Sequence, residues 1–177
     1  MIFYIQTNLW YNKNLVSNDI CKYINSCFTF KQKYYDMANE LNSLHNYNMA
    51  NELNSLHNYN TLHIRCTDNN FNTYFNYNKL FLKIKNLKLN NNTIVLSNNY
   101  QLKKTINKIF GFYYIDNKAI HFAKTKDYTD LEATIIDYII LSKSSNTYCF
   151  TYYIHGSGFS EQCSVLNNIP YKCFIMI

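Results

Sequence analysis

The residues best suited to bind an anion lie at two places that are far apart in the sequence. Arg65 ends a short apolar segment. The second place is a small-residue turn before a helix-like segment, with Ser157, Gly158 and Ser160. A guanidinium is a planar, permanently charged donor to phosphate, and the first N–H groups of a helix attract the same ligand. Two other interpretations stay open: Arg65 pairs with Asp68 at the surface, or Ser157 only caps the helix.

Short apolar segments alternate with helix-like segments over residues 61–177. The segments with the composition of buried strands are 61–66, 93–96, 119–123, 148–152 and 171–177. Apolar residues at helical spacing, with Gly111 as a stop signal for one helix, predict helices over 74–89, 102–110, 131–143 and 158–167. Such alternation is typical of parallel sheets. We therefore predict an α/β fold, in which a Rossmann-like parallel sheet with flanking helices over 61–177 is preceded by a small helical region.

Polar residues follow each of the first four predicted strands. Parallel strands share one carboxyl edge, where sheets of this kind bind ligands. The polar residues are Arg65, Thr67 and Asp68 after the first strand, 97–99 after the second, 124–126 after the third and 155–160 after the fourth. We therefore expect Arg65 and the turn at 157–160 to meet at one edge of the sheet.

Residues 1–60 show a weaker pattern, for which we predict a short helical or irregular region. A helix over 19–27, capped by Asn18 or Asp19, and a strand over 28–30 are expected first. A twelve-residue segment then occurs twice, over 37–48 and 49–60. In the simplest interpretation the duplication lengthens one helix and its loop, with a break at 45–48. A helical seam, or a metal site from His45 and His57, is the alternative.

The composition narrows the class of protein. The chain has 177 residues, 47% of them hydrophobic, which suits one domain with a buried core. No apolar stretch is long enough to span a membrane and no signal peptide is visible, so we expect a cytoplasmic protein. The six cysteines lack Cys-x-x-Cys spacing, and we expect them to be reduced thiols. The formal charge of +6 comes from dispersed lysines, so no nucleic-acid partner is expected. The 29 Asn and 18 Tyr share A/T-rich codons, which indicates an A/T-rich genome such as that of a large DNA virus or a protist.

Two segments resemble one group of sugar-transferring enzymes. Residues 63–68 read HIRCTD, which resembles the His-x-Arg-Arg-Thr-Asp motif of the α1,6-fucosyltransferases and nodulation fucosyltransferases. Residues 134–143 read TIIDYIILSK and precede a predicted strand and the turn SGFS at 157–160, which resembles the end of the donor-binding domain of the same enzymes. The resemblance covers residues 61–177 and corresponds to the carboxyl-terminal half of a GT-B glycosyltransferase.

This resemblance implies transfer of fucose or a similar sugar from a GDP-sugar to an unknown glycan or protein acceptor, with no metal or other cofactor required. Arg65 would be the catalytic residue that contacts the donor pyrophosphate. His63 would support the loop, and Asp137 would order the donor pocket or the helix packing. The donor-binding residues implied by the resemblance are Arg65, Thr67, Asp68, Ser157, Gly158 and Ser160.

The chain departs from the family at several points. Cys66 replaces the second arginine of the motif, and Ser97-Asn98-Asn99 stand where acidic residues are usual. About 60 residues precede the first predicted strand, which is too few for a full acceptor domain. An inactive, truncated remnant that binds a nucleotide or a protein partner without catalysis is therefore the alternative function. A third hypothesis is a scaffold whose duplicated helix docks a partner.

Overall fold

A parallel β-sheet lies at the centre of the computed structural model, which describes residues 16–27, 29–44, 58–66, 76–116 and 128–176. The strands in these ranges are β1 Asn60–Arg65, β2 Thr93–Ser97, β3 Tyr113–Tyr114, β4 Asn146–Thr151 and β5 Tyr171–Ile175. Their order in the sheet is β3-β2-β1-β4-β5, and each neighbouring pair is parallel. The predicted α/β, Rossmann-like fold is therefore confirmed.

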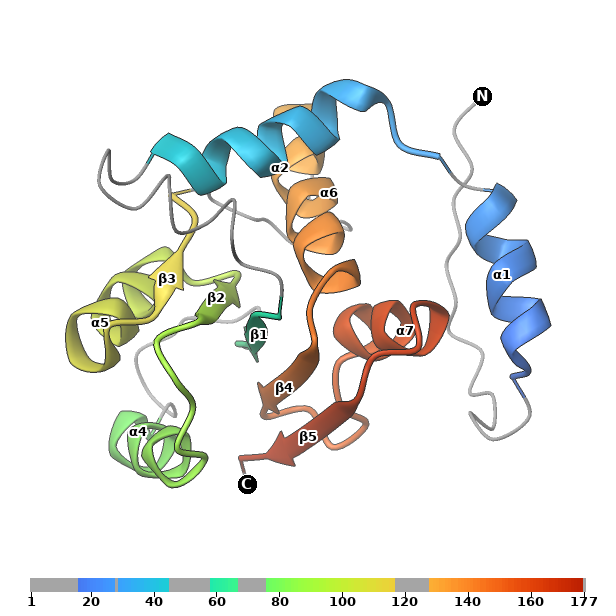
Figure 1. The fold of residues 1–177 in the computed structure, drawn as a ribbon. Coiled ribbons are helices and arrows are strands. Elements are labelled where there is room, and N and C mark those ends of the chain that lie inside the picture. The colour runs from blue at the N-terminus through green and yellow to red at the C-terminus, as the bar shows by residue number, and fades with distance from the viewer. Residues whose placement is uncertain (1–15, 28, 45–57, 67–75, 117–127, 177) are drawn as a thin grey trace.

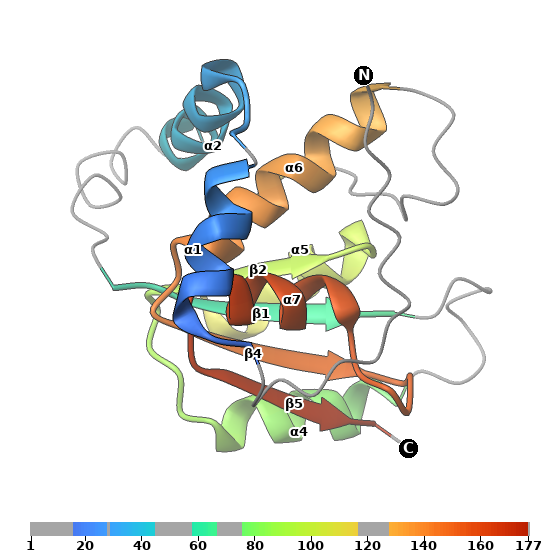
Figure 2. The same cartoon turned by 90° about the vertical axis from the view of Figure 1, so that its right-hand side faces the viewer.

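Helices cover both faces of this sheet (Figure 1). α4 Tyr77–Asn86 and α5 Tyr100–Phe110 pack on one face, whereas α6 Tyr128–Ser142 and α7 Gly158–Leu166 pack on the other. The segment before the sheet forms α1 Asn18–Cys27 and α2 Gln32–Leu44. α1 packs on α7 and α2 packs on α6, so these two helices form an outer layer over the second face (Figure 2).

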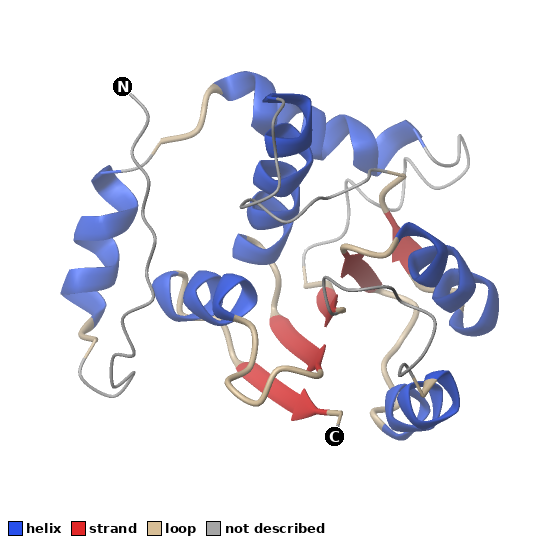
Figure 3. Ribbon diagram, turned by 180° about the vertical axis from the view of Figure 1, so that it is seen from behind, coloured by secondary structure: helices blue, strands red, loops and turns tan. Residues whose placement is uncertain are grey.

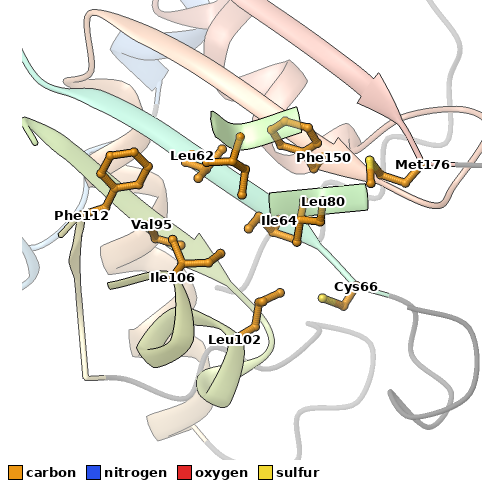
Figure 4. Close-up of a cluster of buried hydrophobic side chains, with 11 residues drawn as sticks. Leu62, Ile64, Cys66, Leu80, Val95, Leu102, Ile106, Phe112, Phe150 and Met176 are labelled. Carbon is orange, nitrogen blue, oxygen red and sulfur yellow. The ribbon is translucent and has the colours of Figure 1, made fainter. Parts of the chain in front are cut away.

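The central strand β1 is buried on both faces, as is usual for a parallel sheet covered by helices. Leu62 and Ile64 face α4 and α5, where they form a cluster of buried side chains with Phe150 and others (Figure 4). Each fully buried aliphatic side chain stabilises the fold by about 1.5–3 kcal/mol relative to an exposed one. His63 alternates with these residues and faces α7. Arg65, two residues later, lies on the same face of β1 as His63.

The two copies of the repeat lead from α2 to the first strand. The first copy begins within α2, where Ala38 is buried against the core on the second face of the sheet. The second copy ends at Asn60, the first residue of β1, and the buried Tyr59 donates its hydroxyl to the carbonyl of Ile140 at 2.6 Å. This bond fastens the entry of β1 to α6. The predicted break at 45–48 and the candidate ligands at 45 and 57 lie outside the described residues.

The start of the described chain differs from the prediction in two details. α1 is capped by Ser17, whose hydroxyl accepts the N–H of Ile20 at 3.3 Å, rather than by Asn18 or Asp19. Residues 29 and 30 lead directly into α2 and do not form the predicted strand. The short polar side chain nearest the first free N–H groups thus determines where α1 begins.

The edge strand β3 lies earlier in the sequence than any strand that was predicted there. α5 ends at Gly111, as predicted, with a φ of +72°. Only two residues further on, Tyr113 and Tyr114 pair with Ile94 and Val95 of β2. Figure 3 shows the resulting sheet from behind, with β3 and β5 at its two ends. The predicted strand at 119–123 lies outside the described residues.

Candidate functional site

The winding of the chain reverses between β1 and β4, which are neighbours in the sheet. β1 is followed by α4 on one face, whereas β4 is followed by α7 on the opposite face. The segments after these two strands therefore separate at the carboxyl edge of the sheet, the position where open parallel sheets bind ligands. We call this position the switch edge; it comprises Arg65 at the end of β1, residues 152–157 between β4 and α7, and Gly158 at the start of α7. Figure 2 shows β1, β4 and α7 side by side.

Arg65 is held at the switch edge by its strand and by an aromatic ring. Its backbone is in register with Thr151, the last residue of β4. The side chain is partly exposed, and Cζ lies 5.5 Å from the centre of the Tyr153 ring. This distance is within the range of a cation–π contact, which contributes about 0.5–1 kcal/mol at an exposed site. The guanidinium is therefore positioned where a ligand at the edge can reach it.

The first turn of α7 lies at the same edge. Ser157 is the N-cap residue, but its side chain makes no capping hydrogen bond. Its carbonyl accepts the N–H of Glu161 as the first bond of the helix, so the N–H groups of 158–160 precede the helical pattern. Gly158 is exposed to solvent. A helix start of this kind attracts an anion through its N–H groups and its dipole.

His63 connects β1 to the first turn of α7 through a contact between aromatic rings. Its ring centre is 5.8 Å from that of Phe159 in the first turn of α7, and its Nδ1 is 4.0 Å from Sγ of Cys149. Arg65 lies two residues further along the same face of β1, a rise of about 6–7 Å, so it follows on the strand face that packs against the first turn of α7. Burial, and to a smaller extent the charge of Arg65, lowers the pKa of His63 to about 3. The imidazole is therefore neutral near neutral pH and acts there as a packing group.

The other predicted site residues occupy different surroundings. Ser157 is 4% exposed, and Ser160 is completely buried with its hydroxyl 3.4 Å from that of Tyr171. The hydroxyl of Ser160 therefore lies in the interior rather than at the surface of the switch edge. Thr67 and Asp68 lie outside the described residues.

Asp137 lies on α6 and is 4% exposed. Its charge acts on Lys103 of α5, a lysine that is completely buried and donates to the carbonyl of Ile115 at 2.8 Å. Burial lowers the pKa of Lys103, and Asp137 opposes this shift. The two residues place opposite charges in the interior, and Lys103 was not singled out in the sequence. The signal that could have found it is its helical spacing to Ile106 and Phe110, which places it beside the apolar stripe of α5.

The positions at which the chain departs from the fucosyltransferase motifs have structural roles. Cys66 is buried against α4 and α5, and burial raises its pKa to about 12. Its N–H donates to Oδ1 of Asn98 at 3.0 Å, and the hydroxyl of Ser97 donates to the carbonyl of Ile64 at 2.8 Å. Asn99 caps α5. Ser97 and Asn98 thus join the end of β2 to the end of β1, and Asn99 binds the first turn of α5.

Two features of the switch edge were missed in the sequence. Tyr153 was not a candidate, because a tyrosine among 18 has no distinguishing pattern. Arg65 was selected for its place after an apolar strand, but a stronger signal was available. It is the sole arginine among 17 basic residues, the other 16 being lysines. In a chain that otherwise uses lysine, an arginine at this position indicates a need for the guanidinium itself.

Neither family models, nor curated proteins, nor solved structures match this chain. Among the helices of the described ranges, none combines the length and the apolar character needed to cross a membrane. The described residues also contain no group of three or more His, Cys, Asp or Glu side chains that could hold a metal ion. A function therefore has to be inferred from the geometry of the switch edge.

Proposed function

We propose that residues 61–177 bind the donor in a glycosyltransferase reaction, in which fucose or a similar sugar passes from a GDP-sugar to a glycan or protein acceptor. The observation that carries the proposal is the contact of Arg65 with Tyr153, which belongs to the segment that leads from β4 into the first turn of α7 at the switch edge. A diphosphate has several anionic oxygens, and a guanidinium and a helix start are two kinds of group that bind them. The resemblance of 63–68, 134–143 and 157–160 to fucosyltransferase motifs supports the same donor.

The chemistry of sugar transfer explains why these groups are suitable. The bond between the anomeric carbon and the diphosphate oxygen breaks, while the acceptor oxygen forms a new bond to that carbon. Negative charge develops on the departing diphosphate. Arg65 would offset this charge together with the N–H groups at the start of α7. A single donor fixed before the reaction commonly lowers the barrier by about 3 kcal/mol.

His63 would act through packing in this proposal. Its neutral ring supports Phe159, and Phe159 belongs to the turn whose N–H groups would contact phosphate. Proton transfer is a poor role for it, because a pKa of about 3 makes the imidazole a weak base near neutral pH. This agrees with the supporting role that the fucosyltransferase resemblance implies for the residue.

A second candidate is nucleotide binding without catalysis. The observation that favours it is the burial of Cys66, which occupies the position of the second arginine of the motif. A neutral thiol within the core contributes no positive charge to the switch edge. Less charge stabilisation of the leaving group would then leave binding intact and reduce transfer.

Calorimetric titration with GDP tests the proposed donor site. Arg65→Ala should weaken GDP binding by about 10- to 100-fold, because charge-assisted hydrogen bonds of about 1.5–3 kcal/mol are lost. Lys22→Ala is the matched control, since it removes one positive charge from the exposed side of α1. Unchanged affinity in the Arg65 variant would contradict the site, and equal affinity for UDP would contradict a preference for guanine. Incubation with GDP-fucose and candidate glycan acceptors then separates the two candidates: GDP binding without release of GDP from GDP-fucose favours the second.

A further inference from the structure

Tyr153 lies two residues beyond the end of β4, in the segment of the switch edge that leads into α7. We propose that it is a positioning residue, whose ring orients Arg65 and whose backbone shapes the turn that leads into α7. The inference rests on the proposed function, because the group that Tyr153 would orient is the one assigned to the donor phosphate. It adds a residue that neither a motif nor a charge in the sequence indicates.

Two hydrogen bonds of the backbone fix Tyr153 at the end of β4. Its N–H donates to the hydroxyl of Thr151 at 3.1 Å, and its carbonyl accepts the N–H of Gly156 at 3.0 Å. Thr151 is the register partner of Arg65. Gly156 has a φ of +82°, a left-handed conformation that glycine adopts without strain. The next residue, Ser157, is the N-cap of α7, so a short series of bonds joins β4, Tyr153 and the helix start.

The ring of Tyr153 contacts both a cation and a second ring. The guanidinium carbon of Arg65 lies 5.5 Å from the ring centre, and the ring of His155 lies 5.4 Å away at an interplanar angle of 37°. The tyrosine itself is partly buried. A ring that is fixed through its backbone and packed against a neighbour offers the guanidinium a surface of defined orientation.

This arrangement would lower the entropic cost of binding phosphate. An exposed arginine has many rotamers, and a ligand that selects one of them loses affinity accordingly. A cation–π contact restricts the side chain without using an N–H donor, so it does not compete with phosphate for hydrogen bonds. Tyr153 would thus pre-organise Arg65 for the donor before the donor arrives.

The single arginine of the chain makes a direct test practical. Protein labelled with ¹⁵N-arginine gives one guanidinium Nε–H signal in an NMR spectrum, and this signal must belong to Arg65. In the ligand-free wild type we expect a ring-current shift and restricted motion of this group. Tyr153→Phe retains the ring and should retain both properties. Tyr153→Leu should move the signal toward that of a free arginine side chain, and Tyr153→Met serves as a second variant without a ring.

Titration with GDP connects this orientation to binding. Loss of the ring should weaken GDP binding by about 2- to 5-fold, the factor that corresponds to a contact of about 0.5–1 kcal/mol, whereas Tyr153→Phe should bind like the wild type. In an Arg65→Ala background the same change at Tyr153 should have no further effect. Circular dichroism of each variant verifies that the fold is retained.

The outcomes separate the inference from the proposed function. An Arg65 signal that is identical in the wild type and in both variants without a ring would overturn the inference. So would a loss of GDP affinity that persists unchanged in the Arg65→Ala background, because Tyr153 would then act independently of Arg65. A wild-type Arg65 signal that does not respond to saturating GDP would overturn the proposed function, and with it any positioning role toward a donor.

Discussion

Acid should destabilise this protein through His63, a residue that is buried between β1 and α7. Burial and the neighbouring charge of Arg65 lower the pKa of His63 to about 3 in the folded chain, whereas an unfolded chain has the ordinary histidine value of about 6.5. Between these two values only the unfolded state binds the proton. The stabilising contribution of the neutral His63 is therefore complete above pH 6.5 and is lost progressively as the pH falls toward 3.

The magnitude follows from the difference between the two pKa values. Each pH unit below about 6.5 removes about 1.4 kcal/mol, so the free energy of unfolding at pH 5 should be about 2 kcal/mol smaller than at pH 7 on account of this residue alone. Urea unfolding at pH 7, 6 and 5 measures this loss. His63→Gln removes the titrating group, so its unfolding free energy should depend less on pH over the same interval.

His155→Gln is the matched control for this measurement, because His155 is exposed at the switch edge. It replaces an imidazole outside the contact between β1 and α7, so comparison of the two variants isolates the contribution of that contact. The reasoning would be refuted if the wild type and His63→Gln lost the same stability between pH 7 and pH 5. Such a result would mean that the imidazole accepts a proton in the folded state, which requires a more open contact between β1 and α7.

Two further substitutions test polar groups of the interior. The buried hydroxyl of Ser164 has no hydrogen-bond partner among the described residues, so Ser164→Ala should leave the free energy of unfolding in urea unchanged or raise it by up to about 1 kcal/mol; a larger loss would indicate a partner. Lys103→Met removes the donor to the carbonyl of Ile115 and the positive charge near Asp137. We expect the free energy of unfolding, measured by thermal unfolding, to fall by about 3 kcal/mol. Lys108→Met, on the exposed side of the same helix, is the control and should change it little. Equal effects of the two substitutions would contradict a buried role for Lys103.

The sheet could be predicted from the sequence wherever a strand is long and buried. The segments around Leu62, Val95 and Phe150 all form central strands, because their mostly apolar and β-branched residues can be buried on both faces of the sheet. β3 could not be predicted in this way. It has two residues, Tyr113 and Tyr114, and a pair of partly buried tyrosines has no period that distinguishes a strand from a loop. Its place is decided by pairing with β2 rather than by its own composition.

The part of the candidate site that depends only on the order and direction of the strands could be predicted from the sequence. Arg65 and the turn before Gly158 follow two strands, and parallel strands bring their carboxyl ends to one edge whatever the details of packing. Tyr153 differs, since its contact with Arg65 depends on the turn closed by Gly156, whose positive φ is a property of the folded loop. The burial of the Ser160 hydroxyl similarly depends on the partner that Tyr171 provides from β5.

The pKa values of His63, two residues before Arg65 on β1, and of Cys66, directly after it, bear on sugar transfer rather than on donor binding. An acceptor hydroxyl must lose its proton during transfer, and a general base works best when its pKa lies near the working pH. His63, with a pKa of about 3, and Cys66, with a pKa of about 12, both lie far from that range. Neither residue is therefore suited to supply the base. In the proposed reaction the base has to come from another group. A substitution that abolishes transfer but leaves GDP binding unchanged would identify that group, and the donor site would then still be intact.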